Sequence, residues 1–119
     1  EPRTTISGIQ WVLMTVDGQT YALPLTVVER ILRMVEVTPL PGAPDVVEGV
    51  IDIQGKVVPV VSIRRRLGLA HRPVELSDSL VVARVRNRRL AVIAESVLGV
   101  VEQSGDDVVK TSDISRATP

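Results

Sequence analysis

The sequence lacks cysteine and is very poor in aromatic residues. Without cysteine it can form neither a disulfide framework nor a thiolate metal site. It has no phenylalanine, one tryptophan and one tyrosine, too few rings for the stacking surfaces of single-stranded nucleic-acid binders. Basic and acidic residues both number 14, so no excess positive charge attracts a polyanion. No apolar run approaches the roughly 20 residues that span a bilayer. We therefore expect a cytoplasmic protein that neither inserts directly into a membrane nor binds nucleic acid.

Aliphatic residues dominate what remains. Apolar residues make up 45% of the chain, and most of them are valine, isoleucine and leucine. β-Branched side chains fit pleated surfaces, and eight glycines and eight prolines divide the chain into short elements. The length of 119 residues suits one domain, assigned to 1–119, with an all-β fold.

The first half of the chain alternates apolar runs with turn signals. Strands are predicted over 9–16 and 20–25, joined by Asp17-Gly18, a strong hairpin signal. Thr26 resembles a helix N-cap, and the spacing of the apolar residues after it predicts a short helix over 27–32. A further strand is expected over 34–38, ended by the proline-rich loop that follows.

The stretch "GVIDIQGKVVPVV", residues 49–61, reads as a hairpin around Gln54-Gly55. Its second strand is apolar on both faces and contains Pro59, which predicts a bend or an unpaired position. Ser62 is expected to cap a helical turn over 63–67. Strands over 79–86 and 89–95, joined at Asn87-Arg88, and an apolar segment over 97–101 complete the prediction.

A half-repeat relates the two parts of the chain at a shift of 69 residues. Setting Tyr21 against Leu90 aligns two hairpin strands, each followed by a short apolar segment. The same shift predicts that a second version of the 49–61 hairpin starts near residue 118. We therefore expect two similar β units, the second lacking its C-terminal hairpin.

Groups that could carry chemistry are few. His71 is the only histidine and lies on a polar connection, where an exposed loop residue is the simpler interpretation. Asp45, Glu48 and Asp52 could form a carboxylate cluster, although scattered solvated charges at the mouth of the hairpin are the simpler interpretation. No nucleotide-binding, nucleophile-elbow or zinc-protease motif is present. We expect no catalytic residue, no cofactor and no metal.

The segment "YALPLTVVERILRMVEVTPLPGAPDVVEGVIDIQGKVVPVVSIRRRLGL" resembles the CheW-like domain of bacterial chemotaxis coupling proteins. The most specific motif is G-V-[I/V]-x-[I/L]-x-G-x-[V/I]-[V/I]-P-[V/I]-[V/I]-x-[I/L]-R, which Gly49 through Arg64 match. The resemblance implies two small five-stranded β-barrels of SH3-like shape, packed side by side with a hydrophobic groove between them. The 49–61 hairpin would then be covered by its own barrel and by the neighbouring one.

The resemblance also implies a non-enzymatic adaptor. Such an adaptor would link the cytoplasmic tip of chemoreceptors to the regulatory domain of a CheA-type histidine kinase, in the cytoplasm at membrane receptor arrays. By resemblance, the partner-binding positions are Val28, Arg30, Gly49, Gln54 and Val81. An open strand edge on the incomplete unit predicts a homodimer or strand exchange with another chain.

Departures from the family pattern keep alternatives open. Gln54 replaces the usual arginine, Ser62 a frequent aspartate and Ser96 a common glycine. An amide cannot reproduce the donors of arginine, which weakens the case for ordinary receptor coupling. One alternative is a CheW-like regulatory domain in a type IV pilus or other chemosensory-like pathway. The other is a small RNA-binding β-barrel that uses the arginines of 64–66 and 84–89.

Overall fold

The computed structural model describes residues 8–103. Eight strands account for most of this part, with one short 3-10 helix and one four-residue α-helix. The elements, in chain order, are β1 (Ile9–Val16), β2 (Gln19–Pro24), η1 (Leu25–Val27), β3 (Val28–Arg33), β4 (Val47–Ile53), β5 (Lys56–Ser62), α1 (Ile63–Arg66), β6 (Ser79–Val85), β7 (Arg88–Ala94) and β8 (Ser96–Gln103). The prediction of an all-β fold is confirmed.

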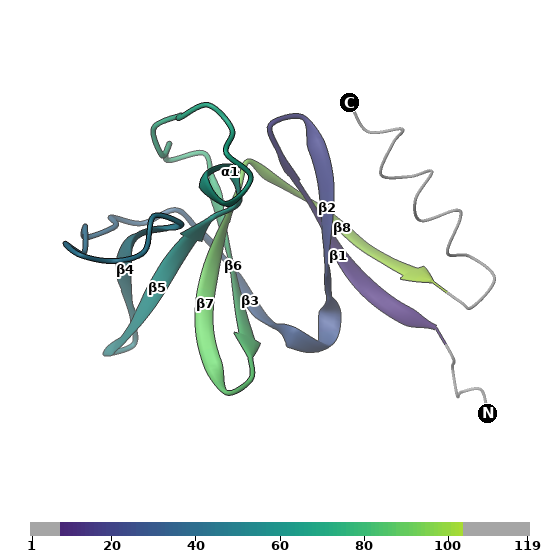
Figure 1. The fold of residues 1–119 in the computed structure, drawn as a ribbon. Coiled ribbons are helices and arrows are strands. Elements are labelled where there is room, and N and C mark those ends of the chain that lie inside the picture. Colours follow the sequence, from purple (N-terminus) through teal and green to yellow (C-terminus); the bar gives the residue numbers. More distant parts are fainter. Residues whose placement is uncertain (1–7, 104–119) are drawn as a thin grey trace.

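The strands form two sheets that pack side by side (Figure 1). One has three strands in the order β2-β1-β8, and the other has five in the order β3-β6-β7-β5-β4. Every neighbouring pair is antiparallel except β5 and β7, which run parallel over Val60–Ser62. Thr38, in the segment after β3, forms a bridge with Val50 of β4, so the two ends of the larger sheet approach each other. This arrangement is compatible with an SH3-like barrel.

Tight two-residue turns set the register of the three hairpins. Both central residues of each turn have positive φ, the conformation that matches the twist of the flanking strands. These pairs are Asp17-Gly18, Gln54-Gly55 and Arg86-Asn87. The first two were predicted. The third lies one residue before the predicted Asn87-Arg88, because the cross-strand pair Val85–Arg88 closes the hairpin there.

Two separate apolar clusters stabilise the fold, one inside the larger sheet and one between the two sheets. The first fills the curved interior of the five-stranded sheet and consists of Met34, Ile51, Ile53, Val58, Val60, Leu80, Val82 and Ala91. The second lies between the sheets, where Met14 of β1 meets Val81, Val92 and Ala94. Alternate residues of β6 thus serve the two clusters, as the period of two in a strand requires.

The 69-residue repeat is present in the strand register. Adding 69 to both members of the pair Val16–Gln19 in the first hairpin gives Val85–Arg88 in the second. The strand after each hairpin then crosses to the other sheet. β3 pairs with β6 through Val28–Ala83, and β8 pairs with β1 through Met14–Val97, which is the same pair shifted by 69. Each sheet is therefore built from a hairpin of one half and the following strand of the other.

The predicted helix over 27–32 is wrong. η1 ends at Val27, and residues 28–33 form the edge strand β3. Val28 and Ile31 have helical spacing, but a β-bulge between Val28 and Arg30 shifts the strand alternation by one residue and produces the same spacing in a strand. The strand expected over 34–38 is also absent, and Thr38 alone pairs there among the described residues.

The 49–61 hairpin is buried on one face only. Its inner side chains belong to the core of the larger sheet, but Val57 on the other face is 68% exposed. The expected cover by the neighbouring unit is therefore wrong, because the smaller sheet packs on β6 and β7 instead. Pro59 is not at an unpaired position, because it pairs with Val50 of β4; it is tolerated because parallel pairing of β5 with β7 begins only at Val60, which leaves the β7 side of Pro59 without a partner strand.

The prediction also assigned the unit with fewer strands to the wrong part of the chain. The prediction gave the incomplete barrel to the second half, whereas the three-stranded sheet combines β1 and β2 with β8, from both ends of the described chain. The position near residue 118 expected to begin a second hairpin lies outside the described residues. Within residues 8–103, no helix has the length and apolarity needed to cross a membrane.

Candidate partner-binding surface

Three of the five predicted partner-binding residues lie on two neighbouring strands. Val28 and Arg30 belong to β3, and Val81 belongs to β6, where it pairs with Ile31. Gly49 and Gln54 belong to the β4–β5 hairpin, at the other end of the strand order. The structure thus brings together Val28, Arg30 and Val81 and leaves the other two residues apart from them.

Burial further divides the predicted residues. Arg30 and Gln54 are exposed and Val28 is half-buried, so these three side chains are available at the surface. Val81 has no exposed area and lies in the cluster between the sheets. Gly49 is buried too, packed against the backbone of Thr38. The packing of Val81 and Gly49 shows a role in the fold, and their contact with a partner stays a prediction.

β3 also exposes an apolar side chain that the sequence prediction missed. Ile31 is 46% exposed and pairs with the buried Val81. Its equivalent at a shift of 69, Val100 on β8, is 51% exposed and pairs with the buried Val12. Each edge strand therefore presents an aliphatic side chain beside the junction of the sheets. Ile31 was not among the predicted partner-binding residues, because assigning 27–32 to a helix gave Val28 and Ile31 the same face and did not distinguish which of its apolar side chains lies outward.

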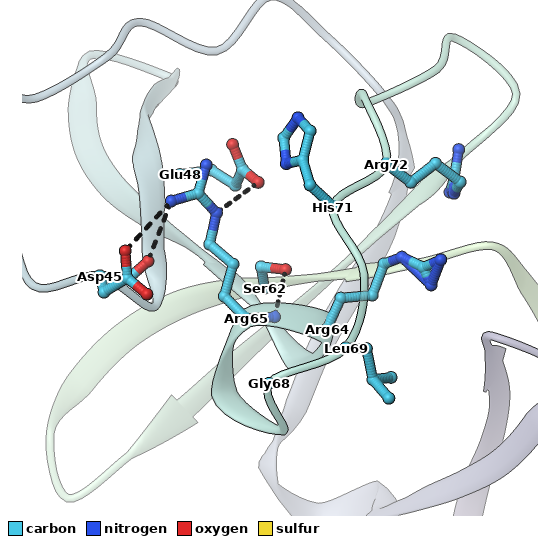
Figure 2. Close-up of a pocket in the computed structure, with 9 residues that line it drawn as sticks. All are labelled: Asp45, Glu48, Ser62, Arg64, Arg65, Gly68, Leu69, His71 and Arg72. Atoms are coloured by element: carbon cyan, nitrogen blue, oxygen red, sulfur yellow. Dashed lines mark hydrogen bonds and ion pairs between the residues drawn. The ribbon is translucent and has the colours of Figure 1, made fainter.

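A hollow of about 290 Å³ opens beside α1, and Figure 2 shows the side chains that line it. Ser62 caps α1 as predicted, its Oγ accepting a hydrogen bond from the Arg65 backbone nitrogen at 3.2 Å. Arg65 donates through Nε to Glu48 at 3.1 Å and lies 3.5 Å from an Asp45 carboxylate oxygen. Asp52 is elsewhere, accepting from the Gly55 backbone nitrogen in its own hairpin turn. The three carboxylates therefore form no cluster.

Arg64 connects the two sheets. It projects from α1, which follows the larger sheet, and lies 3.0 Å from Asp17 in the first hairpin turn of the smaller one. Glu95, between β7 and β8, lies 3.9 Å from Arg64 and accepts a hydrogen bond from the Asp17 backbone nitrogen at 3.0 Å. These contacts lie where the chain crosses from one sheet to the other. Their role is to hold the sheets in a fixed relation.

Arg72 extends the same network into the 69–78 connection. Its guanidinium donates to Asp78 at 2.8 Å and lies 3.5 Å from Glu95. The hydrogen bond to Asp78 raises the pKa of Arg72 and outweighs the effect of burial, which acts in the opposite direction. Asp78 is only 3% exposed and also accepts from the Glu75 backbone nitrogen at 2.9 Å. The network therefore anchors a loop that has no regular secondary structure.

The three arginines that line the hollow form ion pairs, Arg65 with carboxylates of the hollow, and Arg64 and Arg72 with carboxylates beside it. His71 lines the hollow but is exposed, as the sequence prediction had it. Within residues 8–103, no group of three histidine or acidic side chains could hold a metal ion. The arginines and carboxylates form ion pairs that secure local structure, and no nucleophile is paired with a base among these lining residues. The chemistry of this site is that of a structural ion-pair network.

A second charged cluster lies where the β6–β7 hairpin meets β3. Glu29, the bulged residue of β3, accepts hydrogen bonds from Arg84 Nε at 2.8 Å and Arg89 Nε at 2.9 Å. These bonds lower the pKa of Glu29, Arg84 having the largest effect. Figure 1 places this hairpin turn at the opposite end of the molecule from α1. The arginines of 64–66 and 84–89 therefore do not form the single surface that an RNA-binding barrel was expected to use.

Comparison with known proteins agrees with the sequence resemblance. Residues 10–118 match the profile of the CheW-like domain family. The chain is 29% identical to the chemotaxis protein CheW of Rhizobium meliloti, covering 93% of this chain and 72% of that protein. It is also 29% identical to the chemotaxis protein CheW of Thermotoga maritima, covering 82% and 66%. The chain belongs to the CheW-like domain family.

A solved structure supports the fold independently. The scaffolding protein TtCheW from Thermoanaerobacter tengcongensis superposes with a TM-score of 0.78, covering 84% of this chain and 68% of that one. At 21% identity, this likeness shows the shared fold. The resemblance stated from the motif at 49–64 is therefore confirmed, and with it the arrangement of two packed β units.

Proposed function

We propose that this protein is a non-enzymatic scaffold that couples chemoreceptors to a CheA-type histidine kinase in the cytoplasm, at membrane receptor arrays. The observation that carries the proposal is the family match over residues 10–118, together with relatives named as chemotaxis proteins. The engagement of the charged side chains in structural ion pairs fits a protein that works by contact. Pull-down with a receptor cytoplasmic tip and, separately, with a kinase regulatory domain tests it. Binding of neither would contradict the proposal.

The receptor would dock along β3. Val28 and Arg30 offer an accessible side of this edge strand, and Ile31 adds exposed apolar area beside the junction of the sheets. An exposed aliphatic patch flanked by polar groups is typical of a protein-binding surface. Gln54 lies in the distant β4–β5 turn and offers an amide where an arginine is usual in the family. Because this turn lies apart from β3 in the strand order, docking along β3 would not depend on residue 54.

Val28→Asp tests the docking surface. Val28 is half-buried at the rim of the cluster between the sheets, so a carboxylate there can reach water while spoiling an apolar contact. We expect at least a tenfold loss of receptor binding, equal to about 1.4 kcal/mol, with a small fall in melting temperature. Binding is measured by isothermal titration calorimetry and stability by calorimetric melting.

Val35→Asp is the matched control, because Val35 follows β3 and is similarly apolar but 45% exposed. Val35→Asp should change neither the receptor affinity nor the melting temperature appreciably. A collapse of the melting temperature of Val28→Asp would assign Val28 to the core and remove it from the docking surface.

The free edge of β2 provides a second mode of association. The residues of β7 that pair in parallel with β5 are Ala91–Ile93, and their equivalents at a shift of 69 are residues 22–24. Within the described residues, no strand pairs with β2 on this side. We propose that another chain adds a strand here, by homodimerisation or strand exchange, since a free edge is a template for pairing.

Association through β2 would make the mass depend on concentration. Light scattering coupled to size-exclusion chromatography should show a dimer that forms as protein concentration rises. Ala22→Pro removes a backbone N–H that faces the free edge and leaves the Val12–Leu23 pair of the β1–β2 hairpin intact, so it should shift the equilibrium towards monomer. A mass that stays monomeric at high concentration would contradict homodimerisation through this edge.

A further inference from the structure

The tip of the β6–β7 hairpin carries an unusual density of positive charge. We call the four arginines at this end the arginine tip: Arg84, Arg86, Arg88 and Arg89. They fall within six consecutive residues, and Arg30 on the neighbouring strand β3 adds a fifth positive charge nearby. Glu29 is the one acidic group shown bonded to any of them. The tip therefore keeps a strong positive charge on a chain whose formal net charge is zero.

The equivalent hairpin of the smaller sheet shows that the fold does not require these arginines. At a shift of 69, the cross-strand pair Arg84–Arg89 corresponds to Thr15–Thr20. The turn Arg86-Asn87 corresponds to Asp17-Gly18, and both turns have the same pattern of positive φ. Neutral threonines and a glycine-containing turn thus form the same structure. The arginine tip is an addition to the hairpin rather than a condition of forming it.

The arginines also work against the hairpin that carries them. Arg84 and Arg89 are directly opposite on neighbouring strands, where like charges destabilise the pairing. Arg86 has a φ of 53°, which costs energy for a residue with a Cβ atom. Glu29 offsets the first effect by accepting from both opposed arginines. Its two bonds also show that the tip can hold a carboxylate between two guanidinium groups.

The tip is continuous with the proposed docking strand. Val28 pairs with Ala83, which immediately precedes Arg84, and the bulged Glu29 links β3 to the tip. In the described part of the chain, Arg86 and Arg88 have no ion pair. A partner lying along β3 would therefore reach two exposed arginines at the end of its apolar contact.

We propose that the arginine tip binds an acidic segment of the same protein partner that docks on β3. This inference rests on the proposed scaffold function and adds the chemistry of the partner. The partner would carry acidic side chains next to the apolar segment with which it docks on β3. A protein is favoured over a nucleic acid because the tip directly follows the apolar docking strand β3, so that carboxylates on a protein segment would continue an apolar contact. The stacking rings that single strands use are also absent from the tip, since Trp11 and Tyr21 lie on the smaller sheet.

Single charge reversals test the proposal. Arg88→Glu changes the tip, and Arg66→Glu makes the same change of charge on α1, at the opposite end of the molecule. With a receptor cytoplasmic-tip fragment as the probe, Arg88→Glu should weaken binding about tenfold at low ionic strength. Arg66→Glu should stay within about twofold of the unmodified protein, because its charge is far from the contact. Equal effects of the two variants would overturn the proposal while leaving scaffold function intact.

A second probe separates this inference from the function it rests on. A glutamate-rich peptide and the same peptide with glutamines in place of glutamates are each titrated into the full chain, with single-stranded RNA in a parallel titration. The glutamate peptide should bind more tightly than the glutamine peptide and more tightly than the RNA. Arg88→Glu should abolish the difference in affinity between the two peptides. No preference for glutamate over glutamine, or tighter binding of RNA, would overturn the proposal. Failure of both the receptor fragment and the kinase regulatory domain to bind the unmodified protein would contradict the scaffold function, and the peptide result would still decide the chemistry of the tip.

Discussion

Replacing Gly49 by alanine should destabilise the protein by at least about 3 kcal/mol, because the new methyl group has no room. A Cβ atom at this position would collide with the backbone carbonyl of Thr38 and press on the side chain of Val37. Thr38 and Val50 exchange two backbone hydrogen bonds, of 2.9 and 2.8 Å, that join the segment after β3 to β4. The methyl group would therefore force apart the contact that brings the ends of the larger sheet together. Urea unfolding followed by circular dichroism measures the loss.

Gly55→Ala is the matched control. Gly55 has a φ of 84° in the β4–β5 turn, but no atom beyond its two chain neighbours lies within 4 Å of the position its Cβ would take. Its cost should be limited to backbone strain, about 1–2 kcal/mol. If Gly49→Ala unfolded like the unmodified protein and lost only partner binding, Gly49 would be a contact residue rather than a packing residue.

Val81→Asp should unfold the protein or reduce it to a marginally stable state. Val81 has no exposed area and lies between the sheets with Met14 and Val92, where a carboxylate would find apolar side chains instead of water. Burying an unpaired charge, added to the loss of apolar packing, should cost at least about 4 kcal/mol. Thermal melting and the dispersion of amide signals in NMR spectra report the outcome.

Val85→Asp, four residues further along β6, is the matched control for Val81→Asp. Val85 is 42% exposed near the hairpin turn, so Val85→Asp should change the free energy of unfolding by less than about 1 kcal/mol. A stable Val81→Asp variant that had lost receptor binding would restore Val81 as a direct contact. Destabilisation confined to Val81→Asp would support its role in joining the sheets.

The parts of the fold predicted correctly are those determined by neighbouring residues. β1 has the predicted bounds because Asp17-Gly18 marks the turn and the apolar run before it has no competing interpretation. Ser62 was identified as a cap because its hydrogen bond reaches only three residues along the chain. The two-unit architecture was predicted both by the half-repeat at a shift of 69 residues and by the family motif at 49–64.

The errors arose where distant residues decide the structure. Residues 27–32 have the spacing of a helix face, and only pairing with β6 and the bulge at Glu29 make them a strand. The parallel pairing of β5 with β7 has no local signal, nor does the packing of the smaller sheet on β6 and β7. The burial of Val81 and Gly49 follows from these long-range contacts. The family resemblance could therefore name them as partner-binding positions, but the sequence could not show that they are buried.

The exchange of β3 and β8 between the two halves determines how this protein can move. Neither hairpin keeps its own following strand, so each sheet exists only where both halves of the chain meet. No hinge can be drawn between two independent bodies, since two covalent crossings and the Arg64–Asp17 ion pair connect them. The directions of surfaces on opposite units are therefore fixed relative to one another. Partners bound to the two units would therefore be held at a fixed orientation to each other. Unfolding should be a single cooperative event in which both sheets are lost together.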